Sequence, residues 1–240
     1  GDPSPNNIFI SEDPNYSEMR LIDADNICYT TQRGQEVIYT PRYGAPEVVL
    51  GKSSVNTLTD TYAFAVILFE TLTFVHPLLG DHIIDGPPDL EEEAFKGQYP
   101  WIEDTHDPSN KTVRGLEREN VLSPGLMELC EATFGEGLLD PTKRPGMQKW
   151  VDALFSAFDN TILCPSCLGT YYRDKKECPW CSDVDDPHLI PYHILCLIGR
   201  WEPDSVSSKL IKKPVRIQSD GTPQLRAAGS LTLQLNQSVV

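Results

Sequence analysis

Four of the seven cysteines form two Cys-x-x-Cys pairs, Cys164-Pro-Ser-Cys167 and Cys178-Pro-Trp-Cys181, and ten residues separate the pairs. Two such pairs at this spacing suit four thiolates around one tetrahedral zinc ion. A thioredoxin-type redox pair has a single motif in a βαβ context, which this region lacks. The sequence therefore predicts a structural zinc site whose ligands are Cys164, Cys167, Cys178 and Cys181.

The other cysteines and the nearby histidines lie outside this predicted site. Cys28, Cys130 and Cys196 are in apolar surroundings, so we expect buried thiols. His188 and His193 are surplus to a complete four-thiolate site, and we expect them to pack at the surface or in the core.

A second group of polar residues surrounds a predicted hairpin. Its strands are the apolar runs NNIFI (6–10) and MRLID (19–23), and Asp13-Pro14-Asn15 supplies the turn. The hairpin would bring the side chains of Asp2, Asn7 and Asp23 to one end of the strand pair. There Asn7 and Asp23 would share a divalent metal, and Asp2 would accept a proton. Aspartate and asparagine beside a turn also often satisfy only their own backbone, so the pattern by itself leaves both interpretations open.

Five motifs in chain order resemble the C-terminal lobe of the protein kinase fold, over roughly residues 1–158. DPSPNN (2–7) matches the catalytic loop, LIDAD (21–25) stands where kinases carry D-F-G, and YTPRYGAPEVV (39–49) resembles the end of the activation segment with its A-P-E. DTYAFAVILFETLT (60–73) resembles the buried central helix, and DPTKRP (140–145) resembles the late arginine motif.

The resemblance implies catalytic roles for three residues. Asp2 would be the base that orients and deprotonates the acceptor hydroxyl, and Asn7 and Asp23 would hold magnesium against the nucleotide phosphates. The sequence also departs from the family at three positions. Ser4 replaces the lysine that contacts the transferring phosphate, and Ala24 and Asp25 replace the phenylalanine and glycine of D-F-G.

The resemblance also implies a structural scaffold. Glu47 of A-P-E would form a buried ion pair with Arg144, and Asp60 would accept backbone N–H bonds from the catalytic loop. Three threonines of the activation segment are candidate phosphorylation sites, although an ordinary solvated hydroxyl is the simpler interpretation of each: Thr30, Thr31 and Thr40.

The predicted fold class is α+β, with three parts. A mainly α-helical kinase-like C-lobe covers residues 1–160, a four-cysteine zinc ribbon covers 161–186, and a β-rich tail covers 187–240. We expect helices at 60–73 with Asp60 as N-cap, at 89–97, at 123–134 with Ser123 as N-cap, and at 144–158. Six aromatic residues would pack the ribbon or present it to a partner, packing being the main use: Phe155, Phe158, Tyr171, Tyr172, Trp180 and Trp201.

The distribution of charge along the chain indicates which classes of partner it can bind. The 240 residues carry a formal charge of -15, divided into +4 for residues 205–240 and -19 for the rest. Such an acidic body disfavours nucleic acid, and the basic tail is the one stretch that argues otherwise. No run of residues is long and apolar enough for a membrane span, there is no signal peptide pattern, and paired cysteines point to a reducing compartment. We therefore expect a cytoplasmic protein.

A kinase-like region followed by a four-cysteine ribbon resembles bacterial stress-response proteins, including kinases linked to tellurite resistance. That group is encoded beside von Willebrand factor A-like proteins and metal-dependent protein phosphatases, which are therefore the expected partners. A kinase also needs an N-terminal lobe that binds ATP, and the sequence begins at the catalytic loop, as though cut between the lobes. By itself the chain is thus expected to act as a protein-interaction module; the alternative is the catalytic half of an active Ser/Thr kinase that uses ATP and magnesium together with that lobe.

Overall fold

The structure is a computed structural model that describes residues 2–11, 18–22, 39–164, 166–175 and 177–181, and the backbone of four further strands between 197 and 235. Contacts divide the chain into two compact units, Gly1–Pro187 and His188–Val240. The first unit holds the helices and the four-cysteine module, which we define as residues 161–181. None of the helices among the described residues is both long and apolar enough to span a membrane.

The chain opens with the hairpin predicted from the sequence. The 3-10 helix η1 (Pro5–Asn7) leads into β1 (Ile8–Ile10), which pairs antiparallel with β2 (Met19–Leu21), and Ile8 lies opposite Leu21. The predicted turn lies outside the described residues. Phe9, Ile10, Met19 and Leu21 are each more than 60% exposed, so the described part of the chain does not bury the apolar surface of this hairpin.

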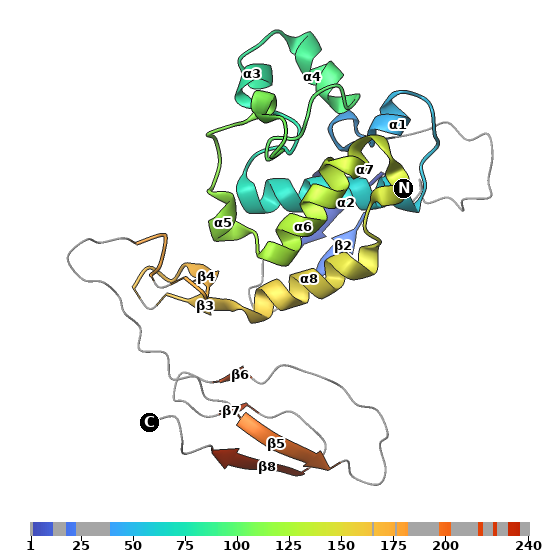
Figure 1. Cartoon of the computed structure of the whole chain (residues 1–240). Coiled ribbons are helices and arrows are strands. Elements are labelled where there is room, and N and C mark those ends of the chain that lie inside the picture. Colours follow the sequence, from blue (N-terminus) through green and yellow to red (C-terminus); the bar gives the residue numbers. More distant parts are fainter. Residues whose placement is uncertain are drawn as a thin grey trace. The chain divides into compact units, whose positions relative to one another are not determined.

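Helix α2 (Thr57–Thr73) runs through the middle of the helical region (Figure 1). Its N-cap is Asn56, whose side chain accepts hydrogen bonds from the backbone of Leu58 and Thr59, while the Thr59 hydroxyl accepts from the Asn56 backbone. The prediction that Asp60 caps this helix is therefore wrong. The reciprocal Asn56–Thr59 capping box satisfies the free N–H groups one turn earlier, which places Asp60 inside the first turn.

The core forms around α2 because this helix is apolar on most sides. Tyr62 and Phe69 are each at most 1% exposed, and their rings meet the ring of Phe134 at centroid distances of 5.8 and 6.0 Å. Phe134 ends α6 (Pro124–Phe134), which begins at the predicted N-cap Ser123. Trp150 of α8 (Met147–Asp159) is fully buried in the same core. Close packing of these aromatic rings fixes the positions of the three helices.

Short elements complete the helical region, and they connect the longer helices within the first unit. They are η3 (Pro41–Tyr43), α1 (Pro46–Val49), α3 (Asp81–Ile84), α4 (Pro88–Phe95), η4 (Pro108–Asn110), α5 (Arg118–Val121), α7 (Glu136–Leu139) and η5 (Pro141–Lys143). The predicted helices at 89–97, 123–134 and 144–158 are confirmed with shifted ends as α4, α6 and α8.

Small antiparallel sheets follow the helices. In the first unit β3 (Thr161–Leu163) pairs with β4 (Thr170–Tyr172). In the second unit β5 (Leu197–Glu202) pairs with β8 (Ser230–Leu235), and β6 (Arg216–Ile217) pairs with β7 (Pro223–Gln224). The predicted fold class, a mainly helical region with small sheets and a four-cysteine module after it, is confirmed.

Candidate functional site

The predicted base Asp2 is held by a residue 38 positions away in the sequence. The backbone N–H of Thr40 donates to Asp2 Oδ1 at 2.7 Å, and the Thr40 hydroxyl donates to Asp2 Oδ2 at 3.0 Å. Both carboxylate oxygens of this half-buried side chain are therefore fixed by one residue of the segment before A-P-E. The hydroxyl of Thr40, a candidate phosphorylation site, is engaged in this contact, whereas Thr30 and Thr31 lie outside the described residues.

Asn7 lies beside Asp2, as the hairpin predicts. Its amide Nδ2 donates to the backbone oxygen of Asp2 at 2.8 Å, so its amide oxygen is the atom that would face a metal. Its backbone oxygen accepts from Ile22 at 2.9 Å, next to the strand end where Asp23 follows in the sequence. Asp23, Ala24 and Asp25 lie outside the described residues. The structure thus brings two of the three predicted catalytic residues together.

Ser4 lies in the middle of the catalytic loop but does not face solvent. The residue is 1% exposed, and its hydroxyl has no hydrogen-bond partner among the described residues. Its backbone oxygen accepts from the Asn7 backbone at 3.0 Å, which closes the loop. The short side chain at this position is thus enclosed by protein, whereas the resemblance implies a lysine here that contacts the transferring phosphate.

The expected ion pair between Glu47 and Arg144 is present. Arg144 Nη1 and Nη2 donate to the two carboxylate oxygens of Glu47 at 2.7 and 2.8 Å, and the Arg144 side chain is completely buried. Arg144 Nε also donates to the backbone oxygen of Gly137, and its guanidinium lies 4.9 Å from the centre of the Tyr62 ring. This network joins α1 to the turn before α8 and to α2. Asp60, in the first turn of α2, lines a small cavity together with Asp2 and Pro3.

Sequence reasoning missed the contacts that hold residues 39–45 against the end of α2. Glu70 accepts from Arg42 Nη2 at 2.7 Å and from the Tyr43 hydroxyl at 2.8 Å. Buried His76 accepts from the Leu78 backbone through Nδ1 and donates from Nε2 to the backbone oxygen of Arg42 at 3.0 Å. Glu70 is the one carboxylate among residues 61–73, a mainly apolar run, and this was the signal that would have drawn attention to it.

Burial shifts the pKa of both titratable groups in these contacts, Tyr43 and His76. Desolvation, followed by the hydrogen bond to Glu70, raises the pKa of Tyr43 to about 12. Desolvation lowers the pKa of His76 to about 4 against the attraction of Glu70, so this imidazole is neutral at pH 7. The segment is therefore fixed by neutral donors and by the ion pairs of Arg42 with Glu70 at 2.7 Å and with Glu91 at 3.9 Å.

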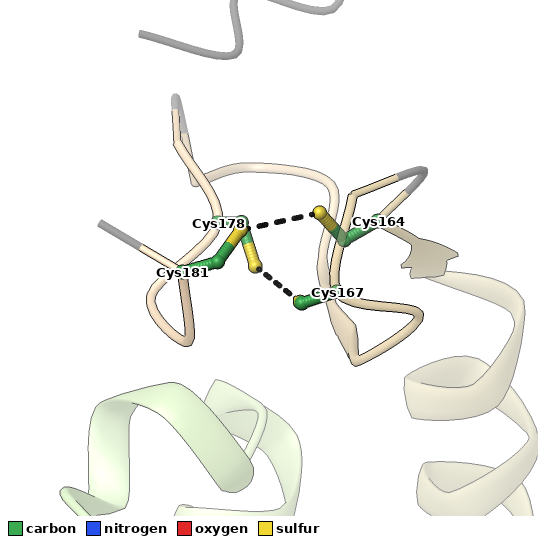
Figure 2. Close-up of side chains that lie close together, drawn as sticks. All are labelled: Cys164, Cys167, Cys178 and Cys181. Carbon is green, nitrogen blue, oxygen red and sulfur yellow. Dashed lines mark hydrogen bonds between the residues drawn. The ribbon is translucent and has the colours of Figure 1, made fainter. Parts of the chain in front are cut away.

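The four predicted zinc ligands come together at the loops beside β3 and β4. Figure 2 shows Cys164, Cys167, Cys178 and Cys181 converging from two knuckles, and their sulfur atoms all lie within 4.8 Å of one another. Sγ of Cys164 is 3.5 Å from that of Cys181, and Sγ of Cys167 is 3.7 Å from that of Cys178. A zinc ion bonded to four thiolates at about 2.3 Å separates the sulfurs by about 3.8 Å, so the donor set fits a tetrahedral zinc ion.

Backbone groups of the first knuckle also suit thiolates. Hydrogen bonds from the backbone of Cys167 and Ser166 lower the pKa of the Cys164 thiol to about 6. The N–H of Gly169 points at Cys167 Sγ at 3.4 Å. A Cβ on Gly169 would lie 2.8 Å from the Trp180 ring, so the absence of a side chain lets the two knuckles approach. Outer hydrogen bonds of this kind orient metal ligands and stabilise their charge.

The aromatic residues around the module divide into two groups. Tyr171 is 2% exposed, Tyr172 packs on the main core, and Trp180 Nε1 donates to the backbone oxygen of Thr170 at 2.7 Å. Phe155 and Phe158 of α8 are 67% and 64% exposed among the described residues, which leaves presentation to a partner as the use that their exposure favours. They point away from the core because Trp150 and Ala157 occupy the buried face of α8.

Among the cysteines and histidines for which the sequence analysis predicted packing outside the zinc site, the prediction is confirmed for Cys130. Cys130 is fully buried, and burial raises the pKa of its thiol to about 12. The remaining residues of this group lie outside the described residues: Cys28, Cys196, His188 and His193.

Comparison with known proteins agrees with this geometry. Residues 2–156, about two thirds of the chain, match the sequence model of the protein kinase domain. The chain belongs to the protein kinase domain family. It is also 28% identical over 178 residues to serine/threonine-protein kinase 17A of Oryctolagus cuniculus. That match covers 57% of this chain and 44% of the relative, so this kinase domain chain spans less than half of the length of the curated relative.

Proposed function

We propose that this kinase domain chain carries the catalytic loop and acceptor platform of a Ser/Thr protein kinase. The observation that carries the proposal is the double hydrogen bond from Thr40 to the carboxylate of Asp2. It fixes a proton acceptor at the segment where an acceptor hydroxyl would be presented. A base that is positioned in this way contributes both orientation and proton transfer.

Three further features support this proposal. The Glu47–Arg144 pair ties the A-P-E segment to the last helices, and Asn7 lies next to Asp2. The relative named above is a Ser/Thr kinase. Magnesium would neutralise phosphate charge at Asn7 and Asp23, and ATP would need a nucleotide-binding lobe, which the exposed apolar strands of the hairpin are suited to contact.

A phosphotransfer assay tests the proposal. The full-length protein that contains this chain is incubated with ATP, magnesium and casein, and phosphoserine and phosphothreonine are measured. We expect Asp2→Asn to lower the rate at least about a hundredfold, because a general base contributes roughly 10²–10⁴. Glu92→Gln, an exposed change on α4, serves as control. Absence of activity in the unchanged protein, together with no thermal shift on adding ATP and magnesium, contradicts the proposal.

The second candidate is a protein-interaction module without phosphotransfer. The buried Ser4, which replaces the phosphate-contacting lysine of the family, favours it, as do Ala24 and Asp25 in place of the usual residues of D-F-G. In this case Asp2 and Thr40 would have only a structural role, and Asp2→Asn would change stability without changing any phosphorylation.

We also propose that the four-cysteine module binds one zinc ion with a structural role. Support comes from the short distances between the four sulfur atoms. In addition, four thiolates complete the coordination of a tetrahedral zinc ion. The partners expected from the bacterial stress-response group, a von Willebrand factor A-like domain and a metal-dependent protein phosphatase, remain a proposal that rests on that resemblance. This proposal is tested by mixing the chain with each of the two partner proteins and measuring whether they co-purify.

A further inference from the structure

A groove of about 780 Å³ lies where the four-cysteine module meets the helical region. It is lined by the loop of residues 112–119, by the beginning of α6, and by Tyr172 at the end of β4 with Asp174 and Lys175 after it. We call it the junction groove. It lies outside the region of Asp2 and Asn7, and neither the catalytic proposal nor the zinc site uses it.

The loop wall of the junction groove is built rigidly. Gly115 has φ +77°, and a Cβ there would lie 2.3 Å from the backbone oxygen of Thr73, so the loop touches the end of α2 directly. The next residue, Leu116, donates to the same oxygen at 2.9 Å. Asp81 accepts from the Thr112 hydroxyl at 2.7 Å and from the Val113 backbone at 3.0 Å. A wall fixed at so many points needs little ordering when a ligand binds.

The module wall is attached to the same helical region across the groove. The Tyr172 hydroxyl donates to the backbone oxygen of Val121 at 3.1 Å, and Lys175 Nζ lies 3.5 Å from Glu119 Oε1. Both residues belong to the segment between the two Cys-x-x-Cys pairs, after Cys167 and before Cys178. The width of the groove therefore depends on the folded state of the four-cysteine module.

The lining combines an apolar floor with an acidic rim. Buried Leu122 and partly buried Met127 form part of the floor, and Val113 at the edge is 95% exposed. The three cations of the lining are each within 4 Å of a carboxylate: Arg114 of Asp85 at 2.7 Å, Arg118 of Glu103 at 2.9 Å, and Lys175 of Glu119 at 3.5 Å.

The carboxylates of the rim outnumber these cations. Glu103, Glu117, Glu119 and Asp174 all line the groove, and the last three are exposed. Because the cations are already matched by acidic partners, the rim attracts positive charge. The strongly acidic composition of the whole chain adds to this attraction at long range.

We propose that the junction groove binds a segment of a partner protein in which basic side chains alternate with apolar ones. Apolar side chains of that segment fill the floor near Leu122 and Met127, and its lysine or arginine side chains pair with Glu117 and Asp174. Charge complementarity selects this partner over an acidic segment or a nucleic acid, both of which the rim repels.

Fluorescence anisotropy with a labelled peptide tests the proposal. The probe is a peptide in which lysine and leucine alternate, and the comparison peptide has glutamate in place of lysine. The groove variant is Glu117→Lys with Asp174→Lys. The matched control is Glu92→Lys with Glu136→Lys, which changes the net charge equally at exposed sites outside the groove. Thermal melting of both variants verifies that they are folded.

We expect the lysine peptide to bind, the glutamate peptide not to bind, and the groove variant to weaken binding at least about tenfold while the control changes it much less. Equal weakening in both variants would show a general attraction to an acidic surface and would overturn the proposal. So would failure of the lysine peptide to bind, or equal binding of the two peptides.

Discussion

Arg144 donates from both terminal nitrogens to both carboxylate oxygens of Glu47, a residue 97 positions earlier in the chain. The arginine side chain is completely buried and that of the glutamate is 13% exposed, so each charge depends on the other for compensation. Planar, two-point pairing of this kind is specific to arginine.

The first prediction follows from this pair. Glu47→Gln leaves the buried guanidinium without its charge partner, and we expect the free energy of unfolding to fall by about 3–5 kcal/mol. The free energy of unfolding is measured by urea denaturation, with circular dichroism as the signal. Glu136→Gln, at a side chain that is 80% exposed and lies 3.8 Å from the exposed Lys143, is the matched control and should change stability by less than about 1 kcal/mol. Similar small losses in both variants would mean that the buried pair adds nothing beyond an exposed one.

The second prediction concerns Thr40 and rests on the proposed kinase activity. Thr40→Val removes the hydroxyl that donates to Asp2 but keeps the shape and the backbone donor, and Thr40→Ser keeps both donors. We expect the valine variant to lose phosphotransfer rate about tenfold or more, and the serine variant to keep most of it, because small displacements of a catalytic group are costly. Rates for casein phosphorylation in the full-length protein measure this. Equal rates for the two variants would exclude a positioning role for the hydroxyl.

The third prediction concerns the buried hydroxyl of Ser4. Since this oxygen has no hydrogen-bond partner among the described residues, removing it should relieve a desolvation cost of about 1–3 kcal/mol. We expect Ser4→Ala to raise the melting temperature, as measured by differential scanning calorimetry. Ser123→Ala is the contrasting variant and should lower it, because that hydroxyl accepts from the Leu126 backbone as the N-cap of α6. A lower melting temperature for Ser4→Ala would reveal a partner of the hydroxyl.

The fourth prediction concerns metal in the four-cysteine module. Elemental analysis should find one zinc ion per chain, and Cys164→Ser should lower this content and open the module. A loss of protection from hydrogen exchange at residues 161–181, with α2 still protected, is the expected result of metal removal by a chelator, since folding of such a module is coupled to metal binding. An unchanged exchange pattern after chelation would show that the module folds without metal.

The fifth prediction is a dependence of stability on pH through His76. Its pKa falls from 6.5 to about 4 on folding, chiefly through burial, so the unfolded chain binds the proton more strongly. This contribution to stability is complete above about pH 6.5 and is lost as the pH falls toward 4, at roughly 1.4 kcal/mol per pH unit. Arg42 and Glu70 face the imidazole, and their opposite charges act in opposite directions on its pKa.

Urea denaturation between pH 4 and 7 measures this dependence, with His76→Gln as the variant that cannot titrate. The difference in the free energy of unfolding between the two proteins should shrink as the pH falls. A difference that stays constant across this range would mean that His76 does not titrate on unfolding.

The sequence predicted the parts of this protein whose structure depends on local spacing. The two Cys-x-x-Cys pairs indicated a shared site because each pair closes a short knuckle, and the sulfur atoms do converge. Alternating strands around a turn indicated the hairpin that brings Asn7 beside Ile22. Ser123 and Pro124 marked the start of α6. The serine hydroxyl accepts from a free N–H group of the first turn, and the proline has no N–H group to satisfy.

The tertiary structure decided what depends on contacts between distant residues. Spacing does not tell that Thr40 fixes both oxygens of Asp2, that Ser4 turns into the core, or that Glu70 and His76 hold residues 39–45. It also does not show that Tyr172 and Lys175 close a groove against the helical region. Such contacts arise only when the apolar faces of α2, α6 and α8 pack together, because that packing determines which polar side chains are buried and which neighbours remain to satisfy them.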